Sequence, residues 1–144
     1  MPSETFRTVT EEETIALGRK LGSRLTGVVL LIGNLGAGKT TLTKGLVEGR
    51  GAATAEAVSS PTFTLIHRYG EDVFHVDLYR LDEAREVEAL GLDELFDTGS
   101  LVVLEWAERF PELMPADRTE IRIRALADDS REIEITRFSE NISS

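Results

Sequence analysis

An apolar run that leads directly into a glycine-rich loop constrains this chain more than any other feature of its sequence. Residues 28–32, VVLLI, have the length and the β-branched composition of a strand that is buried on both faces. The loop GNLGAGKTT spans residues 33–41, and the residues after it are typical of a short helix that ends at Gly49 or Gly51. A buried strand, a glycine loop and a helix in this order predict an α/β fold.

The loop has the spacing G-x-x-x-x-G-K-[ST] of a P-loop. Its glycines let successive backbone N–H groups point at phosphate oxygens, beside the positive end of a helix dipole. Lys39 would add a positive charge at the β- and γ-phosphates, and the Thr40 hydroxyl is a hard oxygen ligand suited to Mg²⁺. An ordinary glycine turn is the alternative, but the flanking strand and helix favour a site for ATP and Mg²⁺ formed by Gly33, Asn34, Leu35, Gly36, Ala37, Gly38, Lys39, Thr40 and Thr41.

Two carboxylates end apolar strands elsewhere in the chain, and a P-loop enzyme needs an acid near its magnesium ion. Glu105 closes LVVLEW, which is typical of a buried parallel strand beside the P-loop strand, so we assign it to Mg²⁺, directly or through water. Asp77 closes VFHVDLY, and we assign it, with Lys39, to catalysis, where it would position or deprotonate the attacking water. The alternative for either carboxylate is a helix cap or a surface ion pair.

Four further side chains are candidates for the site because of their positions in the sequence. Thr62 follows the small, polar segment 52–62 and could reach the γ-phosphate and Mg²⁺, as switch segments do. His67 and His75 lie in the two strands of a predicted hairpin, where packing or a satisfied hydrogen bond is expected rather than catalysis. Trp106 is either a core residue or an aromatic residue at the rim of the site.

The remaining segments complete a three-layer arrangement. Thr10 and Glu13 form a capping box for a helix over residues 11–25, in which each side chain accepts an N–H of the first turn. Antiparallel hairpins are predicted around Gly70 and around residues 127–130, where alternation places isoleucines on one face and paired Arg and Glu residues on the other. We therefore predict one domain, residues 1–138, with a P-loop NTPase-like fold, a central mixed β-sheet and a frayed tail at residues 139–144.

Composition narrows the possible functions. The formal net charge is −10, so direct contact with a nucleic-acid backbone would need a local basic patch or a partner. The acidic segment 81–97 is predicted to be helical with a break at Gly91, and is either a solvated face or a docking surface for a basic partner. The chain has no cysteine, no apolar run of membrane-spanning length and no basic-then-apolar N-terminus, so we expect a cytoplasmic protein without a membrane segment.

Four motifs, GNLGAGKTT, SPTFTL, HVDLYRL and LEWAERF, resemble in order and spacing the bacterial TsaE (YjeE) family of small P-loop ATPases. The resemblance extends over about residues 10–138. It is made specific by His75-x-Asp77-x-Tyr79-Arg80 and by Glu105-Trp106-x-Glu108, in addition to the P-loop.

This resemblance implies a function in making threonylcarbamoyladenosine, a modified base of tRNA. It implies an ATPase that is weak alone and that supports the turnover of a complex of the TsaB and TsaD proteins, without itself transferring the threonylcarbamoyl group. Contact with tRNA would then be indirect. By position it implies that Lys39 and Thr40 bind phosphate and Mg²⁺, that Glu105 binds Mg²⁺ and that Asp77 acts in hydrolysis.

The resemblance also implies that Thr62 belongs to a switch-like loop and that Trp106 and Glu108 lie beside the nucleotide. For the adenine we predict contacts from the loop near Thr10 and from the turn at Ser130 and Arg131. We expect a monomer. Two alternatives are a small-molecule or nucleoside kinase, although the chain leaves little room for an acceptor lid, and a GTP switch, although no N/T-K-x-D-like segment follows the second buried strand.

Overall fold

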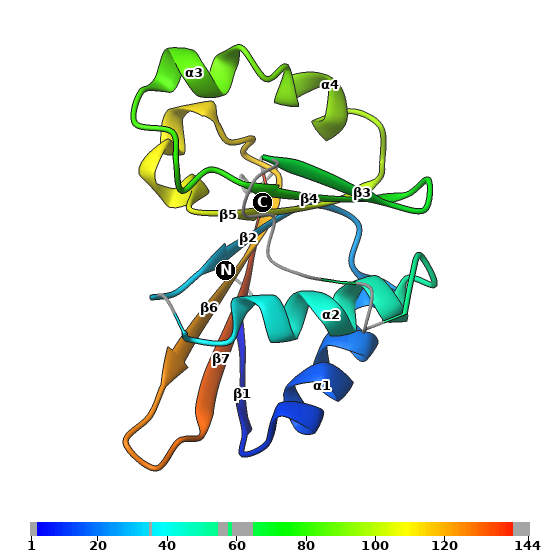
Figure 1. Ribbon diagram of the computed structural model, residues 1–144, viewed down its shortest axis with the longest axis vertical. Helices are drawn as coiled ribbons and strands as arrows, with labels where there is room; N and C mark the ends of the chain where they lie inside the picture. The colour runs from blue at the N-terminus through cyan, green and yellow to red at the C-terminus, as the bar shows by residue number, and fades with distance from the viewer. Residues whose placement is uncertain (1–2, 35, 55–57, 59–64, 140–144) are drawn as a thin grey trace.

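The structure is a computed structural model that describes residues 3–34, 36–54, 58 and 65–139. A central sheet of seven strands separates two layers of helices (Figure 1). In chain order the elements are β1 (Ser3–Thr8), α1 (Glu11–Arg24), β2 (Gly27–Ile32), α2 (Lys39–Gly49), β3 (Ile66–Tyr69), β4 (Val73–Asp77), α3 (Ala84–Glu88), α4 (Leu92–Phe96), β5 (Leu101–Glu105), the 3₁₀ turns η2 (Ala107–Arg109) and η3 (Pro111–Leu113), β6 (Arg118–Ala125) and β7 (Arg131–Phe138).

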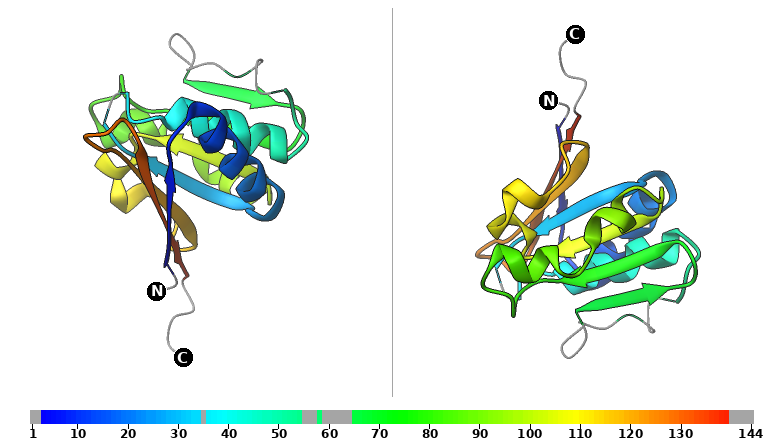
Figure 2. Two further views of the ribbon diagram at one scale, coloured as in Figure 1. Left: turned by 90° about the horizontal axis from the view of Figure 1, so that it is seen from below. Right: turned by 90° about the horizontal axis from the view of Figure 1, so that it is seen from above.

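The strand order is β1-β7-β6-β2-β5-β4-β3. The four central strands β6, β2, β5 and β4 are parallel to one another, whereas β3, β7 and β1 pair antiparallel with their neighbours. The sheet twists strongly from the β3 edge to the β1 edge (Figure 2). The predicted α/β fold with a central mixed sheet and antiparallel hairpins is thus confirmed.

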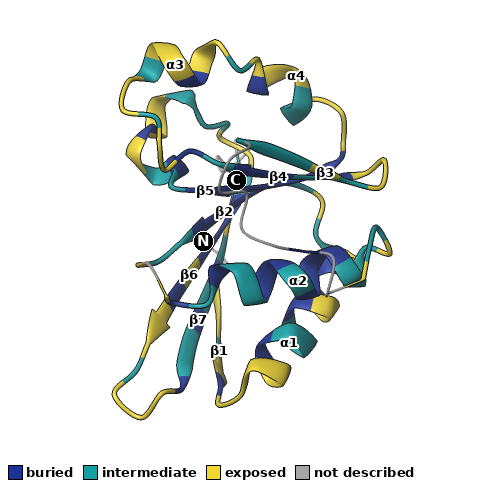
Figure 3. Ribbon diagram, in the orientation of Figure 1, coloured by how far each residue is buried: buried dark blue, intermediate teal, exposed yellow. Residues whose placement is uncertain are grey.

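Two apolar cores lie on the two faces of the sheet (Figure 3). Val29 and Leu31 of β2 face the helix pair α1 and α2, and Val28 and Leu30 face α3 and α4. Each of these four side chains is at most 4% exposed. Because alternate residues of a strand point to opposite faces, an unbroken apolar run is what a strand covered on both sides requires.

Helices α1 and α2 approach each other closely through glycines. A Cβ atom at Gly45 would lie 2.2 Å from the carbonyl oxygen of Ile15, and the same holds at 2.1–2.6 Å for Gly18, Gly22 and Gly49 against backbone oxygens of the facing helix. Gly18 and Gly22 of α1 and Gly45 and Gly49 of α2 therefore set the short distance between α1 and α2, the helix that begins at the P-loop.

The sequence-based boundaries hold within one residue for α1, β2 and α2. The acidic segment forms two short helices separated at Gly91, and the last hairpin pairs Ile121 with Ile135 and Arg124 with Glu132 as predicted. Strand β1 was not predicted, since SETFRT carries no strong alternation and is largely exposed. Among the described helices none is both long enough and apolar enough to cross a membrane.

The cap of α1 differs in part from the predicted one. The Thr10 hydroxyl accepts the N–H of Glu13 at 3.1 Å, as expected. The Glu13 carboxylate instead accepts the N–H of Val9, one residue before the cap, at 2.9 Å. The chain enters α1 from β1, and this turn brings the N–H of Val9 within reach of the carboxylate.

Candidate functional site

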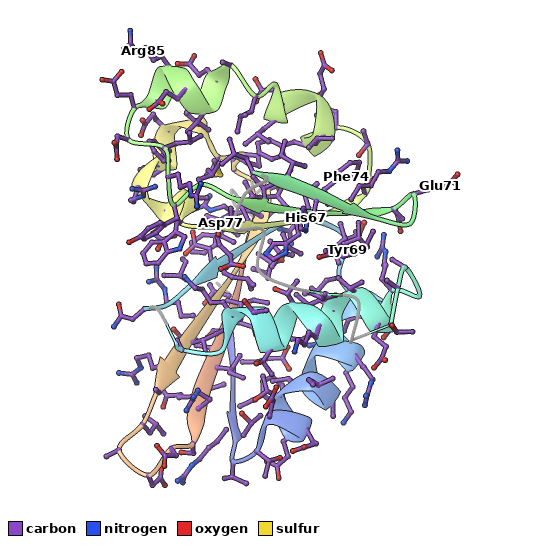
Figure 4. The ribbon with its side chains drawn as sticks, in the orientation of Figure 1. His67, Tyr69, Glu71, Phe74, Asp77 and Arg85 are labelled. Carbon is purple, nitrogen blue, oxygen red and sulfur yellow. The ribbon has the colours of Figure 1, made fainter. Side chains whose placement is uncertain are left out.

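The predicted site residues converge at one edge of the sheet, where parallel strands end. Asp77, Glu105 and Leu31 are paired laterally across β4, β5 and β2, and the P-loop starts two residues after Leu31. Asp77 lies at the end of β4 that is opposite the turn carrying Glu71 (Figure 4). In open α/β sheets, ligands bind at this carboxyl edge of the strands.

The P-loop curls back to start α2 at Lys39. The N–H of Ala37 donates to the carbonyl of Asn34 at 3.0 Å, and Gly38 has a φ of 109°. A residue with a Cβ would be strained in that conformation, which explains the glycine before the lysine. Thr40 follows in the first helical turn and is half-buried.

Lys39 is 5% exposed, and its ammonium lies between a carboxylate and an aromatic ring. Its Nζ is 3.9 Å from Oε1 of Glu105 and 3.8 Å from the centroid of the Trp106 ring. Within the described residues this nitrogen has no hydrogen-bond acceptor. Burial lowers the pKa of Lys39, and the carboxylates of Glu105, Glu108 and Asp77 partly oppose that shift.

Glu105 is 4% exposed and ends β5. Its second oxygen, Oε2, lies 2.6 Å from Nε2 of His75, which is fully buried. The expectation that His75 is packed and hydrogen-bonded is met, and its partner is the predicted magnesium ligand. His67 pairs instead with Tyr69, whose hydroxyl is 3.3 Å from its Nδ1.

Asp77 is half-buried at the end of β4. Its Oδ1 accepts the N–H of Tyr79 at 2.9 Å. Burial raises the pKa of the Asp77 carboxyl, the bond from Tyr79 opposes this, and the nearby Glu105 raises it further. The carboxylate therefore holds a proton more readily than an exposed aspartate does.

Trp106 adopts a left-handed backbone conformation, with φ of 67°, immediately after β5. Non-glycine residues in this region are strained and often mark functional sites. The indole packs against the apolar core on the α3 and α4 side of the sheet, and it also covers Lys39. Trp106 therefore contributes both to the core and to the rim of the candidate site. Tyr79, which is 50% exposed, packs edge-on against it with a centroid distance of 5.1 Å.

Arg109 ties the segment after Asp77 to the segment after Glu105. Its Nη2 donates to the carbonyls of Leu78, of Tyr79 at 3.2 Å and of Leu81 at 2.9 Å. Its Nε lies 3.5 Å from the carbonyl of Trp106. The guanidinium thus fixes the segment that follows Asp77 relative to the segment that follows Glu105.

A separate pocket lies between the start of α1, the start of α2 and the turn before β7. It joins the two regions predicted to contact adenine, because Thr10 and Arg131 both line it together with Gly38 and Thr41 of the P-loop region. Its remaining lining residues are Thr8, Val9, Glu11, Thr14 and Asp129. Val9 is 59% exposed there and offers an apolar surface. Ser130 is buried in the same turn and bonds to Asp128.

For several other predicted site residues, the structure gives less information about their contacts. Leu35 and Thr62 lie outside the described residues. Asn34 and Gly36 line a pocket on the outer side of the P-loop, beside Arg122 and Arg124. Glu108 acts electrostatically on Lys39, and its Oε1 is buried without a hydrogen-bond partner in the described part of the chain.

Two contributions were missed by the sequence analysis. The first is the bond between His75 and Glu105, and the second is the clamp formed by Arg109. The spacing of His75 and Asp77 contained a signal for the first, since residues two apart on a strand point to one face. No sequence signal indicated that Arg109 would reach three carbonyls of another segment.

The residues present fit a nucleotide with Mg²⁺. The described residues contain no ready-made group of three His, Asp or Glu side chains that could hold a metal ion alone. Mg²⁺ at a P-loop needs few protein ligands, because phosphate oxygens and water complete its shell. A buried lysine without an acceptor is the matching feature for the phosphate itself.

Comparisons with known proteins show which family the chain resembles. The family described as "Threonylcarbamoyl adenosine biosynthesis protein TsaE" matches residues 8–133. The tRNA threonylcarbamoyladenosine biosynthesis protein TsaE of Bacillus subtilis (strain 168) is 43% identical over 136 residues, which cover 91% of this chain and 84% of the relative. The protein of the same name from Haemophilus influenzae is 39% identical over 131 residues, which cover 87% and 81%.

A solved structure is similar as well. The crystal structure of YdiB from Bacillus subtilis matches with a TM-score of 0.78 and 35% sequence identity, over 96% of this chain and 87% of that chain. The resemblance found in the four sequence motifs is thereby confirmed over nearly the whole length. The chain belongs to the TsaE family.

Proposed function

We propose that the protein is a Mg²⁺-dependent ATPase that takes part in the formation of threonylcarbamoyladenosine in tRNA. The pathway is the one named for its relatives. The observation that carries the ATPase proposal is the buried Lys39 ammonium, which lacks a hydrogen-bond acceptor among the described residues and lies where the P-loop meets α2. Phosphate oxygens would supply the missing acceptors.

Two oxygen ligands, the Thr40 hydroxyl and the Glu105 carboxylate, would hold Mg²⁺, Glu105 directly or through water. When bound, the ion neutralises charge on the phosphate oxygens. The backbone N–H groups between Gly33 and Thr41 and the ammonium of Lys39 would orient the triphosphate. Trp106 and Glu108 would flank Lys39 and exclude water from it.

Asp77 would act on the attacking water. The bond from the N–H of Tyr79 fixes Oδ1, so the carboxylate cannot rotate freely and Oδ2 is available to orient the water. The raised pKa of Asp77 makes it a better proton acceptor than an ordinary aspartate. Arg109 would keep this carboxylate in register with the residues that follow β5.

The nucleoside would bind in the pocket between Thr10 and Arg131, next to Gly38 and Thr41. Val9 would give the base an apolar surface, and Arg131 would lie along its other side or near the first phosphate. Thr62, which lies outside the described residues, would contact the γ-phosphate and Mg²⁺, as the family resemblance implies. The support for this nucleoside site is that one pocket is lined by residues from both regions that the sequence analysis assigned to adenine.

The hydrolysis of ATP would act on a complex of the TsaB and TsaD proteins and would support its turnover rather than transfer the threonylcarbamoyl group. A net charge of −10 suits indirect contact with tRNA, because the protein as a whole repels a phosphate backbone. We also propose that the protein acts in the cytoplasm, as a monomer when it is alone.

The decisive experiment measures phosphate release from labelled ATP, with and without purified TsaB and TsaD and with Mg²⁺ or EDTA. We expect weak release alone, strong stimulation by the two proteins and none in EDTA. Lys39→Ala and Thr40→Ala should each abolish it, and Lys44→Ala, on the same helix outside the site, is the control. Label on an acceptor molecule would instead indicate a kinase, and full activity in both site variants would refute the proposal.

A further inference from the structure

We propose that His75 is a positioning residue: it forms a hydrogen bond to one oxygen of Glu105 and thereby orients the other oxygen toward the Mg²⁺ and phosphate site. The proposal rests on the proposed function, since Glu105 is assigned to Mg²⁺ there. It gives a role to a histidine for which the sequence indicated packing or a hydrogen bond only. It also explains how the Glu105 carboxylate can bond to His75 with one oxygen while the other oxygen remains for the Mg²⁺ and phosphate site.

The two oxygens of Glu105 have different surroundings. Oε2 lies 2.6 Å from Nε2 of His75, which is a short, strong hydrogen-bond distance. Oε1 lies 3.9 Å from Nζ of Lys39, which is within ion-pair distance but too long for a direct hydrogen bond. One oxygen is therefore anchored and the other faces the nucleotide side.

The sheet makes this arrangement rigid. Asp77 pairs laterally with Glu105, and His75 pairs with Val103, so the histidine lies one step back along the same face. His75 is 0% exposed and Glu105 is 4% exposed, which leaves neither side chain room to rotate into water. A glutamate has three side-chain torsions, and the bond to His75 restricts them before any ligand binds.

The histidine makes no second hydrogen bond in the described part of the chain. Its Nδ1 is buried without a hydrogen-bond partner there, so the bond to Glu105 is the one that compensates for burying the ring. On the same face of the sheet, Val73 of β4 and Val103, the partner of His75 in β5, are apolar and fully buried. An apolar residue at position 75 would avoid the cost of burying a polar ring. It would also leave Oε2 of Glu105 without its hydrogen bond.

The direction of the bond follows from the chemistry of the pair. An ionised carboxylate only accepts, so Nε2 of His75 must carry the proton. A metal ligand held by a fixed hydrogen bond keeps its orientation, and removal of such a partner typically lowers metal affinity by about 10–100-fold.

The test compares His75→Leu, which removes the donor, with His75→Gln, whose amide nitrogen can replace Nε2. Calorimetry would measure the affinity of the ADP complex for Mg²⁺, and electron paramagnetic resonance would measure Mn²⁺ in its place. We expect His75→Leu to bind either ion about tenfold more weakly or worse. His75→Gln should stay near the wild type, and ADP affinity in EDTA should be unchanged in both variants.

An unchanged ion affinity in His75→Leu, or an equal loss in His75→Gln, would overturn the positioning role. Failure of the proposed function looks different, since the wild type itself would then bind no divalent ion together with ADP. The two failures are therefore distinguishable in the same titration.

A second measurement needs no variant at position 75 and no ligand. The chain has only two histidines, so nitrogen-15 NMR resolves both rings, and His67→Asn assigns them. We expect a proton on Nε2 of His75, shifted strongly downfield by the short bond. A ring with its proton on Nδ1 and a bare Nε2 would overturn the proposal.

Discussion

The ammonium of Lys39 lies 3.8 Å from the centre of the Trp106 indole ring. This cation–π contact holds the lysine where the described residues give it no hydrogen-bond acceptor. A cation–π contact is less directional than a hydrogen bond, so phosphate oxygens can replace the ring as the partner of the ammonium. Trp106 reaches this position because its backbone turns sharply after β5, with a positive φ.

Trp106 should report nucleotide binding by its fluorescence. It is the only tryptophan in the chain, so its emission has no background from another indole. When phosphate draws Lys39 away, the charge over the ring moves, and we expect a change in emission that saturates with added ADP. Trp106→Phe should remove the signal while calorimetry still detects binding. Emission that does not respond to saturating ADP would contradict the contact as a feature of the nucleotide-free protein.

Asp77→Asn should separate ATP hydrolysis from nucleotide binding. The variant keeps an oxygen for the N–H of Tyr79 but cannot take a proton from water, so we expect hydrolysis to fall by about 100-fold or more. ADP affinity should be unchanged. The measurement is phosphate release with the partner proteins present, and a turnover rate equal to that of the wild type would refute the role of Asp77 in hydrolysis.

The same variant should show a pH-dependent gain in stability. Burial raises the pKa of Asp77 in the folded protein above 3.8, so the ionised carboxylate disfavours folding at pH 7. Asp77→Asn should therefore resist urea better than the wild type at pH 7. As the pH falls through the raised pKa toward 3.8, the wild type binds a proton and the difference should shrink. A difference that grows on acidification would contradict the raised pKa.

Arg109→Met should destabilise the protein and slow hydrolysis. Three carbonyls lose their donor, and we expect the free energy of unfolding to fall by about 1 kcal/mol. Arg109→Lys should restore little, because one ammonium cannot reproduce the guanidinium fork. Arg85→Met is the matched control, since that guanidinium in α3 is 83% exposed and forms an ion pair with the exposed Glu83 (Figure 4). Equal effects at both positions would argue against the clamp.

Gly45→Ala should destabilise the protein although alanine favours helices. A Cβ there would lie 2.2 Å from the carbonyl oxygen of Ile15, so α1 and α2 must move apart. We expect a loss of about 1–3 kcal/mol in urea unfolding, whereas Lys20→Ala, at an exposed position of α1, should be nearly neutral. A stable Gly45→Ala protein with unchanged nucleotide affinity would show that this close approach does not hold the P-loop helix in place.

Local patterns were enough to predict the elements around the P-loop and the last hairpin. The run VVLLI is apolar on both faces, and the alternation of Ile with Arg and Glu fixes the register of β6 and β7. Strand β1 escaped prediction because an exposed edge strand needs no apolar pattern. Its place is set by pairing with β7, a partner more than a hundred residues away in sequence.

Local spacing and neighbouring residues were enough to predict a P-loop and to identify the two strand-ending carboxylates, Asp77 and Glu105. The folded chain was needed to show that His75 and Lys39 lie beside different oxygens of Glu105, that Trp106 covers the ammonium and that Arg109 joins the segments after β4 and β5. These contacts join residues up to 67 positions apart, as between Lys39 and Trp106 (106 − 39). Strand order and sheet twist set such distances, and no local pattern encodes them.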